Sequence, residues 1–349
     1  MVDRGLVAIT IVTYNSGGFI RQCLSYALAQ DYERCEVIVI DNASQDGTAG
    51  ILREFQDRIR VVYNRDNVGF ASGQNQAIAL SNAEWVLTLN PDVRLNPDFV
   101  SALVSAGEAD SSAGSVCGKL LAMSADFEIP AKPVFDSTGI FFTPNQRHFD
   151  RGSQQADEGQ YDQFEHVFGA TGAACLYRRE MIEDISIDGE FFDADFFAYR
   201  EDADVAWRAQ LLGWQCLYAP SAVAYHVRSV LPTHREAVSA IVNMHSVKNR
   251  WLMRIKNMTA NLYRRHCFSV TWRDFLVLGG CLLRERSSLR AFALIWKARH
   301  RTWRKRLQIM GRRRATDHDI NRWFSYRPVS YPVPEVAARA GAGEKTVNR

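Results

Sequence analysis

Three apolar, β-branched runs in the N-terminal part of the chain each stop abruptly at polar side chains. The runs cover residues 7–12, 37–40 and 85–89, and the polar stretches that follow them cover residues 13–15, 41–47 and 90–92. Uninterrupted apolar strands separated by helical patterns indicate a parallel sheet that is covered on both faces. Ligands bind beyond the carboxyl ends of such strands. The pattern therefore predicts an α/β fold with a site at the edge where the three polar stretches meet.

A fourth pattern begins directly behind the aromatic residues at 196–199. Glu201, Asp202 and Asp204 stand at the start of an amphipathic stretch that stops at Gly213. Acidic side chains in the first turn of a helix interact favourably with its dipole, so an ordinary helix start explains these acids equally well when they are taken alone. The three polar strand ends upstream favour a role in chemistry.

Composition limits the class of protein. A chain of 349 residues with 47% apolar side chains can bury a large core and form one big domain with an appendage. Seven cysteines without a Cys-x-x-Cys pair suggest reduced thiols in a cytoplasmic protein. The N-terminus lacks the pattern of a signal peptide. The apolar run at 275–283 is shorter than the roughly 20 residues that span a membrane, so no spanning helix is expected.

Charge is divided unevenly along the chain. Residues 1–245 carry 18 Lys and Arg against 33 Asp and Glu, whereas residues 246–315 carry 19 against two, Asp274 and Glu285. The cations are interleaved with apolar and aromatic residues, which is typical of helices that lie on an anionic membrane surface. The alternative use of the apolar face is a sealed core or a homodimer contact. Nucleic-acid binding is a third interpretation, but no recognition motif is present and the acidic half would repel phosphates.

These patterns suggest four segments. Residues 1–118 and 119–232 are expected to form two halves, for which the family resemblance described below implies nucleotide-sugar binding in the first and acceptor binding with catalysis in the second. Residues 233–325 are expected to form a basic amphipathic helical region, and 326–349 a flexible tail rich in Pro, Ala and Gly.

The order and spacing of the motifs resemble one known family. The matching residues are Thr13-Tyr14-Asn15, Asp41 to Gly47, Asn67 to Ala71 with Gly73 and Asn75, Asn90-Pro91-Asp92, Glu201 to Asp204 with Arg208 and Gly213, and His226. Together they resemble the inverting family 2 glycosyltransferases with the GT-A fold, and are most similar to the rhamnosyltransferase-like and galactofuranosyltransferase-like members that build bacterial polysaccharides. This resemblance covers about two thirds of the chain. It implies transfer of a sugar from a nucleotide diphosphate, with dTDP-rhamnose as the expected donor, to a lipid-linked saccharide at the inner face of the membrane.

The resemblance also implies a set of donor-binding residues, with Asp41 at the base. The set is Thr13, Tyr14, Asn15, Asp41, Asn67, Gly69, Phe70, Asn75, Asn90 and Asp92. Gly69 and Gly73 carry no side chain, which would let this segment approach the donor closely. The structural alternatives are a capped turn at Asp41 and a loop followed by a helix start around Asn67.

A divalent cation, Mg²⁺ or Mn²⁺, would neutralise the diphosphate leaving group. Asp92 suits this task, and His226 would supply a nitrogen ligand, which is more natural for Mn²⁺. Asn90 replaces the first acid of the usual Asp-x-Asp pattern, so one negative charge is missing and strict metal dependence is open. A packed histidine is the alternative for His226, whose 24-residue spacing from Asp202 matches galactofuranosyltransferase-like enzymes.

An inverting transfer needs a base that deprotonates the acceptor hydroxyl. The resemblance supports Asp202 as this base, with Glu201 as its orienting neighbour and Asp204 on the helix surface or bonded to Arg208. The small residues at 169–174, which include Gly172 and Ala173, would let the acceptor lie against the backbone, and a tight turn before the strand that reaches Tyr177 is the alternative. Asp193 is also expected at the acceptor. A nucleotidyltransferase is the rival enzyme class, but it needs a basic phosphate loop after the first strand, and residues 14–18 contain no Lys.

Overall fold

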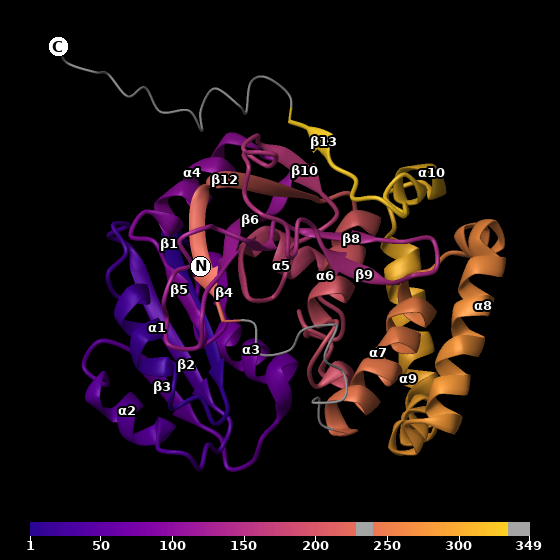
Figure 1. Cartoon of the computed structure of the whole chain (residues 1–349), viewed down its shortest axis with the longest axis horizontal. Coiled ribbons are helices and arrows are strands. Elements are labelled where there is room, and N and C mark those ends of the chain that lie inside the picture. Colours follow the sequence, from indigo (N-terminus) through magenta and orange to yellow (C-terminus); the bar gives the residue numbers. More distant parts are fainter. Residues whose placement is uncertain (228–239, 334–349) are drawn as a thin grey trace.

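The computed structural model describes residues 1–227 and 240–333. Its strands are β1 (Asp3–Thr13), β2 (Cys35–Asp41), β3 (Arg60–Tyr63), β4 (Ala83–Leu89), β5 (Val93–Leu95), β6 (Ala113–Ala122), β7 (Phe135–Ser137), β8 (Ile140–Phe142), β9 (His148–Asp150), β10 (Glu165–Val167), β11 (Ala174–Arg178), β12 (Gln215–His226) and β13 (Tyr331–Pro332). Eleven of them form one sheet in the order β13-β10-β12-β6-β11-β4-β1-β2-β3, with β5 attached to β12 and β7 to β6 (Figure 1). The separate pair β8 and β9 forms a small second sheet.

The N-terminal part of the sheet is parallel, as its apolar strands predict. Pairing is parallel from β4 through β1 and β2 to β3, and again between β6 and β12. Strand β11 runs antiparallel between β4 and β6 and joins the two parallel parts. The strands of the centre are buried on both sides, which explains their continuous apolar character.

Helices cover both faces of the sheet. They are α1 (Ile20–Ala27), α2 (Thr48–Glu54), α3 (Gly69–Ala79), α4 (Phe99–Ala109), α5 (Arg179–Ile185), the short 3₁₀ helix η1 (Ala194–Phe196) and α6 (Glu201–Leu211). The side chains of α1, α2 and α4 share a core with Val7, Ile9 and Ile11 of β1. The opposite face packs against α3, α5 and α6. The predicted mixed α/β fold with helices on both faces is therefore confirmed.

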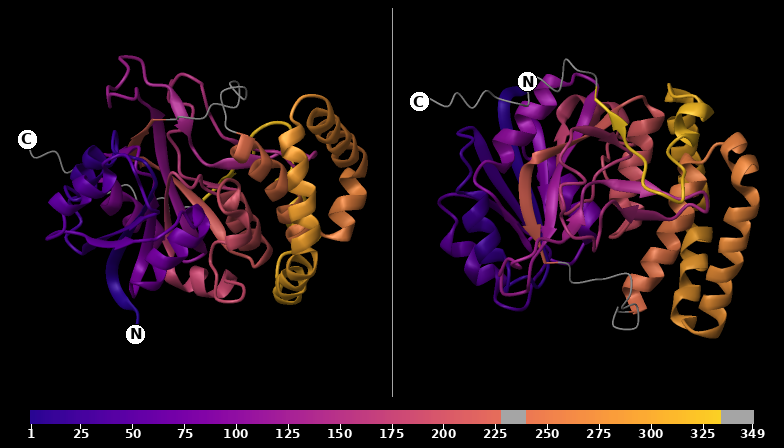
Figure 2. Two further views of the ribbon diagram at one scale, coloured as in Figure 1. Left: turned by 90° about the horizontal axis from the view of Figure 1, so that it is seen from below. Right: turned by 45° about the horizontal axis from the view of Figure 1, so that its top comes forward.

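The C-terminal region forms a helical layer beside the sheet domain (Figures 1 and 2). It consists of α7 (Ala240–Asn257), α8 (Ala260–Leu283), the 3₁₀ helix η3 (Arg286–Leu289), α9 (Arg290–Arg312) and α10 (Asp317–Asn321). Helix α7 packs against α6 and α9, whereas α8 lies at the outer edge of the molecule (Figure 1). None of the helices in the described ranges is long and apolar enough to cross a bilayer.

Two of the expected segment boundaries do not coincide with structural ones. Residue 118 lies inside β6, and because β6 pairs with β11 and β12, the two expected halves share one sheet. The beginning of the expected flexible tail is ordered, because β13 pairs with β10 and the Tyr331 ring packs against Trp323 at 4.8 Å. The remaining part of that tail, residues 334–349, and the boundary near residue 232 lie outside the described residues.

Candidate active site

The register of the sheet brings the predicted strand-end residues to one edge. Thr13 and Asp41 are direct partners across β1 and β2. Leu89, the last residue of β4, is the partner of Ile11 in β1, so Asn90 emerges beside Thr13. The Thr13 hydroxyl is buried and has no hydrogen-bond partner among the described residues, and the Tyr14 side chain is exposed. Polar groups from three strands therefore surround the carboxyl end of the sheet.

Asp41 is buried beneath the loop that follows β2. Its two carboxylate oxygens accept hydrogen bonds from the Ser44 hydroxyl at 2.5 Å and the Ser44 N–H at 3.3 Å. The Asn15 side chain accepts the Gln45 N–H at 2.8 Å, and the Asn15 N–H donates to the Ser44 hydroxyl at 2.8 Å. The loops after β1 and β2 are thus tied together, which fixes the position of Asp41.

The segment from Asn67 to Asn75 is committed mainly to internal packing. The Asn67 side chain accepts the Gly69 N–H at 2.9 Å. Gly69 has φ +84°, and a Cβ there would lie 2.5 Å from the Phe197 carbonyl oxygen. Both ends of the Asn75 amide bond the Phe192 backbone, at 2.7 and 2.9 Å, so the side chain holds α3 against the loop before η1. Phe70 likewise packs edge-on against the Phe192 ring at 6.0 Å.

The predicted pair Asp92 and His226 is brought together by the antiparallel pairing of β5 with β12. His226 is the register partner of Val93, and its Nε2 lies 3.4 Å from Asp92 Oδ1. Its other ring nitrogen, Nδ1, is 2.8 Å from Asp136 Oδ2 in β7. A carboxylate on the second nitrogen of a histidine fixes the orientation of the ring and leaves the first nitrogen available to a ligand.

The same contacts set the charge of His226. Burial favours the neutral imidazole, but the hydrogen bonds to Asp136 and Asp92 outweigh it and raise the His226 pKa to about 10. Without a metal the ring is therefore a cation between two carboxylates. No group of three or more His, Cys, Asp or Glu side chains within the described ranges could hold a metal. The protein thus offers one carboxylate and one imidazole nitrogen, a donor set that fits a cation shared with phosphate oxygens.

Asp202 lies in the first turn of α6, next to the end of β4. Its Oδ1 accepts the Ala203 N–H at 2.7 Å, and its Oδ2 accepts the Gly172 N–H at 3.1 Å. The next residue, Ala173, accepts the Asn90 N–H through its carbonyl at 2.9 Å. Through these two hydrogen bonds, Gly172 and Ala173 hold Asp202 close to Asn90, which follows β4 and precedes Asp92.

Burial raises the pKa of both acids at the start of α6. Burial and the neighbouring Asp202 charge raise the pKa of Glu201 to about 8. Burial also raises the pKa of Asp202, although the hydrogen bonds from the Gly172 and Ala203 N–H groups stabilise its ionised form and lower the pKa in part. Glu201 Oε2 has no partner within the described chain and makes no hydrogen bond to Asp202. The backbone, rather than Glu201 as predicted, orients Asp202.

The loop before Asp202 has an unusual backbone. Phe197, Tyr199 and Arg200 all have positive φ values, between 66° and 70°. Such conformations are costly for residues other than glycine and persist only when the surroundings impose them. Here the Asn249 amide of α7 donates to the carbonyl oxygens of Phe196, Ala198 and Tyr199, all within 2.9 Å. The C-terminal layer therefore holds the loop that presents the acid.

Two predicted roles are corrected by burial. Asp204 does not lie on the helix surface: it is fully buried, where it bonds Arg208 at 3.0 Å, as the alternative prediction states, and Lys256 at 2.9 Å. Asp193 was expected at the acceptor, but it is buried and accepts hydrogen bonds from Lys256 and Lys305, which hold its pKa far below the ordinary range despite burial. Neither carboxylate is free to contact a substrate.

Sequence reasoning missed Asp136 and Asn249. Asp136 stands in a region without clear periodicity, in the three-residue strand Phe135–Ser137, and nothing in that sequence marks it as a site residue. Asn249 lies in a helix that is rich in basic residues, and it is one of two buried asparagines there, with Asn257, so the sequence gives no signal that its amide contacts the loop before Asp202.

Comparison with known proteins agrees with this geometry. A family model described as glycosyl transferase family 2 matches residues 8–186. N-acetylglucosaminyl-diphospho-decaprenol L-rhamnosyltransferase of Mycobacterium tuberculosis (strain ATCC 25618 / H37Rv) is 24% identical over 325 residues, which cover 87% of this chain and 98% of the relative. Poly-beta-1,6-N-acetyl-D-glucosamine synthase of Staphylococcus aureus (strain MSSA476) is 21% identical over 221 residues, 63% of this chain and 49% of the relative.

Solved structures show the same fold at low identity. The structure of S. aureus TarS 1-349 aligns with a TM-score of 0.53 and 16% identity, covering 87% of this chain and 89% of that one. The mannosyltransferase PcManGT from Pyrobaculum calidifontis, in complex with GDP-Man and Mn²⁺, aligns with a TM-score of 0.50 and 16% identity, covering 88% and 85%. Since the family model spans slightly more than half of the chain, the protein belongs to glycosyl transferase family 2 and is a glycosyltransferase with the GT-A fold.

Proposed function

We propose that this glycosyltransferase transfers rhamnose from dTDP-rhamnose, with inversion, to a hydroxyl of a lipid-linked saccharide at the cytoplasmic face of the membrane. The observation that carries the proposal is the placement of Asp202, a carboxylate with a raised pKa held by two N–H groups beside the strand ends. The donor and acceptor classes rest on the rhamnosyltransferase relative, whose name specifies a diphospho-decaprenol acceptor and which aligns over nearly its whole length.

In the proposed reaction Asp202 is the general base. It takes the proton of the acceptor hydroxyl while the hydroxyl oxygen bonds to the anomeric carbon and the bond from that carbon to the diphosphate breaks. Attack occurs on the face opposite the leaving group, so the configuration inverts. Gly172 lies against the Asp202 side chain, and with Ala173 it forms a backbone surface on which an acceptor sugar can lie.

The donor would lie across the ends of β1, β2 and β4. Asp41 and the Thr13–Asn15 turn would bind the base and ribose, and Asn90 would bond the ribose or phosphate. Asp92 and His226 would hold a divalent cation, and Asp136 would keep the His226 ring in place. Such a cation supplies positive charge that stabilises the diphosphate as it leaves.

A donor screen tests the proposal. Purified protein is given dTDP-rhamnose, UDP-N-acetylglucosamine or GDP-mannose with a polyprenyl-diphosphate-linked N-acetylglucosamine acceptor, and released nucleotide is measured. We expect release with dTDP-rhamnose and an inverted linkage by NMR. Selective turnover of another donor would replace the rhamnose assignment, and a retained configuration would exclude Asp202 as the base of a single displacement.

The cation is tested in the same assay. We expect activity to fall in excess chelator and to return with Mn²⁺ or Mg²⁺, and Asp92→Ala to weaken donor binding more than His226→Ala. Full activity in excess chelator, together with an inactive Asp92→Ala variant, would mean that Asp92 binds the donor directly and that no divalent cation is needed.

A further inference from the structure

Helix α8 is the most exposed large helix of the C-terminal layer. Of its 24 residues only Leu262, Val270 and Cys281 are buried, and these three lie on one side of the helix. The other residues of this long helix are exposed or half-buried, and the helix lies at the edge of the molecule (Figure 1).

The side of α8 opposite its buried residues carries a continuous row of large apolar side chains. We call this row the α8 stripe, and it consists of Phe268, Trp272, Phe275, Leu276, Leu282 and Leu283. Its members repeat at intervals of four and seven positions, which places them on one helix face. Phe268 is 89% exposed and Leu283 85%. A contiguous apolar surface of this kind marks an interaction site.

An apolar groove adjoins the α8 stripe. It has a volume of about 260 Å³ and lies between α8, α7 and the start of α9, with walls that include Trp251, Leu278 and Phe292. Phe275 belongs to both the groove and the stripe. A partner that covers the stripe would therefore cover the mouth of the groove as well.

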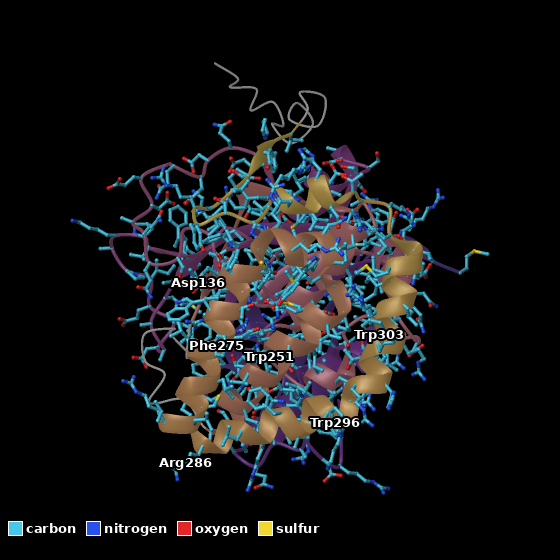
Figure 3. The ribbon with its side chains drawn as sticks, turned by 90° about the vertical axis from the view of Figure 1, so that its right-hand side faces the viewer. Asp136, Trp251, Phe275, Arg286, Trp296 and Trp303 are labelled. Carbon is cyan, nitrogen blue, oxygen red and sulfur yellow. The ribbon has the colours of Figure 1, made fainter. Side chains whose placement is uncertain are left out.

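Three cations stand just beyond the C-terminal end of the α8 stripe. Three exposed arginines stand within seven positions after Leu283, namely Arg284, Arg286 and Arg290, and none of them forms an ion pair with a described residue. Arg286 lies at the lower end of the helical layer, with Phe275 above it (Figure 3). The two acids of residues 246–315 offset this charge only in part. Asp274 is engaged by Arg250 and Arg254, and Glu285 can balance at most one of the three arginines.

We propose that the α8 stripe and these three arginines dock the protein on an anionic lipid bilayer, with the stripe in the interfacial region and the arginines on lipid phosphates. Large apolar residues beside uncompensated cations are the features that hold a helix in a membrane interface. A second copy of this chain fits less well. A parallel symmetric contact through this face would set the arginine clusters of both copies together, and an antiparallel one would set each cluster near the exposed Arg264 and Arg265 of the other copy. The proposal does not depend on which sugar the enzyme transfers.

Vesicle binding of the full-length protein tests this docking. The protein is sedimented with vesicles of phosphatidylcholine alone or of phosphatidylcholine with phosphatidylglycerol, at low and at physiological salt. We expect binding to the anionic vesicles that weakens with salt. The combined variant Arg284→Gln, Arg286→Gln, Arg290→Gln should bind about a hundredfold more weakly, since each cation near an anionic surface contributes about fivefold. Phe275→Ser with Leu276→Ser should weaken binding about tenfold or more.

Matched variants on the far side of the sheet domain serve as controls. Arg53→Gln with Arg58→Gln removes two exposed cations, and Tyr63→Ser removes one exposed aromatic ring. We expect both to bind like wild type, and thermal unfolding confirms that every variant is folded. Equal binding to neutral and anionic vesicles, no binding at low salt, or α8 variants that bind as wild type would overturn the proposal. So would a concentration-dependent dimer in sedimentation velocity that the Phe275→Ser, Leu276→Ser variant abolishes.

Discussion

The carboxylate of Asp202 is the side chain on which the proposed chemistry depends most directly. In Asp202→Asn the amide oxygen can still accept one of the two N–H groups that hold the side chain, so the fold should persist while the base is lost. We expect the rate of transfer to fall by about 10²–10⁴-fold with donor affinity nearly unchanged. Turnover with a soluble acceptor analogue and calorimetric titration of the donor nucleotide measure the two quantities separately.

Glu201→Gln is the companion variant. If it lowers the rate as much as Asp202→Asn, or if Asp202→Asn keeps more than about a tenth of wild-type activity, the base is Glu201 or another group.

The raised pKa of Glu201 predicts how stability depends on pH. Glu201 ionises near 4.5 in an unfolded chain and near 8 in the folded protein, so between these values the folded state binds more protons than the unfolded one. The contribution of Glu201 to stability is therefore fully present below the lower value and is lost as the pH rises towards 8. We expect Glu201→Gln to flatten this decrease in the free energy of unfolding, measured by denaturant titration across that range. An identical slope in both proteins would show that Glu201 ionises normally in the folded state.

Individual residues also show where prediction from sequence stops. Asp92 and His226 were paired correctly because each closes a recognisable motif and β5 and β12 are neighbours. Asp136 could not be foreseen, since it reaches His226 from 90 positions away along the chain. Asp193 was misassigned because an acid near a catalytic motif resembles a site residue until its buried lysine partners are known.

At the scale of elements, α7 supports the loop that precedes Asp202. Asn249→Leu would remove the amide that bonds three carbonyl groups of that loop. We expect kcat to fall by about 10–100-fold, because small displacements of a catalytic group are costly, whereas the KM for the donor should change little. Steady-state kinetics with varied donor at saturating acceptor measures kcat and the KM for the donor separately.

Val270→Ala is the control for lost stability, since it opens a cavity under α8 away from the loop. If it lowers kcat as much as Asn249→Leu at an equal loss of stability, Asn249 has no specific positioning role.

The ion pairs that η1, its N-cap Asp193 and α6 make with the C-terminal helices differ sharply in burial. Lys256 is fully buried between Asp193 and Asp204, whereas Arg301 pairs with Asp195 at the surface with half of its side chain exposed. Lys256→Met leaves two carboxylates buried without this partner and should cost about 3–5 kcal/mol of unfolding free energy. Arg301→Met should cost less than about 1 kcal/mol. Chemical denaturation measures both, and equal losses would contradict this distinction.

The basic region was only partly interpretable from its pattern. Its charge excess predicts one amphipathic surface. Four of its cations are instead buried and donate hydrogen bonds to carboxylates or carbonyl groups of the catalytic half, namely Lys248, Arg250, Lys256 and Lys305. Charge counts do not distinguish cations that neutralise a buried acid from cations that face solvent. The parallel strands were predictable because a strand buried on both faces is apolar throughout, whereas the antiparallel insertion of β11 depends on distant pairing.

At the scale of the whole molecule, the C-terminal layer is part of the catalytic fold. Helix α7 supplies the Lys256 ammonium to Asp193 and Asp204 and the Asn249 amide to the loop before Asp202. A fragment of residues 1–239 would lose these groups and expose the apolar face of α6 and its neighbours. Removal of the layer therefore cannot separate membrane docking from folding, which is why point variants on α8 are the sharper test.

We expect the fragment of residues 1–239 to be insoluble or to unfold without a cooperative transition. Each buried carboxylate that loses its partner costs several kcal/mol, and a typical domain is stable by only about 5–15 kcal/mol. Soluble yield, circular dichroism and thermal unfolding, compared with the full chain, measure this. A fragment that unfolds cooperatively and still binds the donor nucleotide would show that the sheet domain is autonomous. In that case the contacts of α7 would serve the acceptor step alone, and restoring activity by adding residues 240–349 as a separate chain would become the informative experiment.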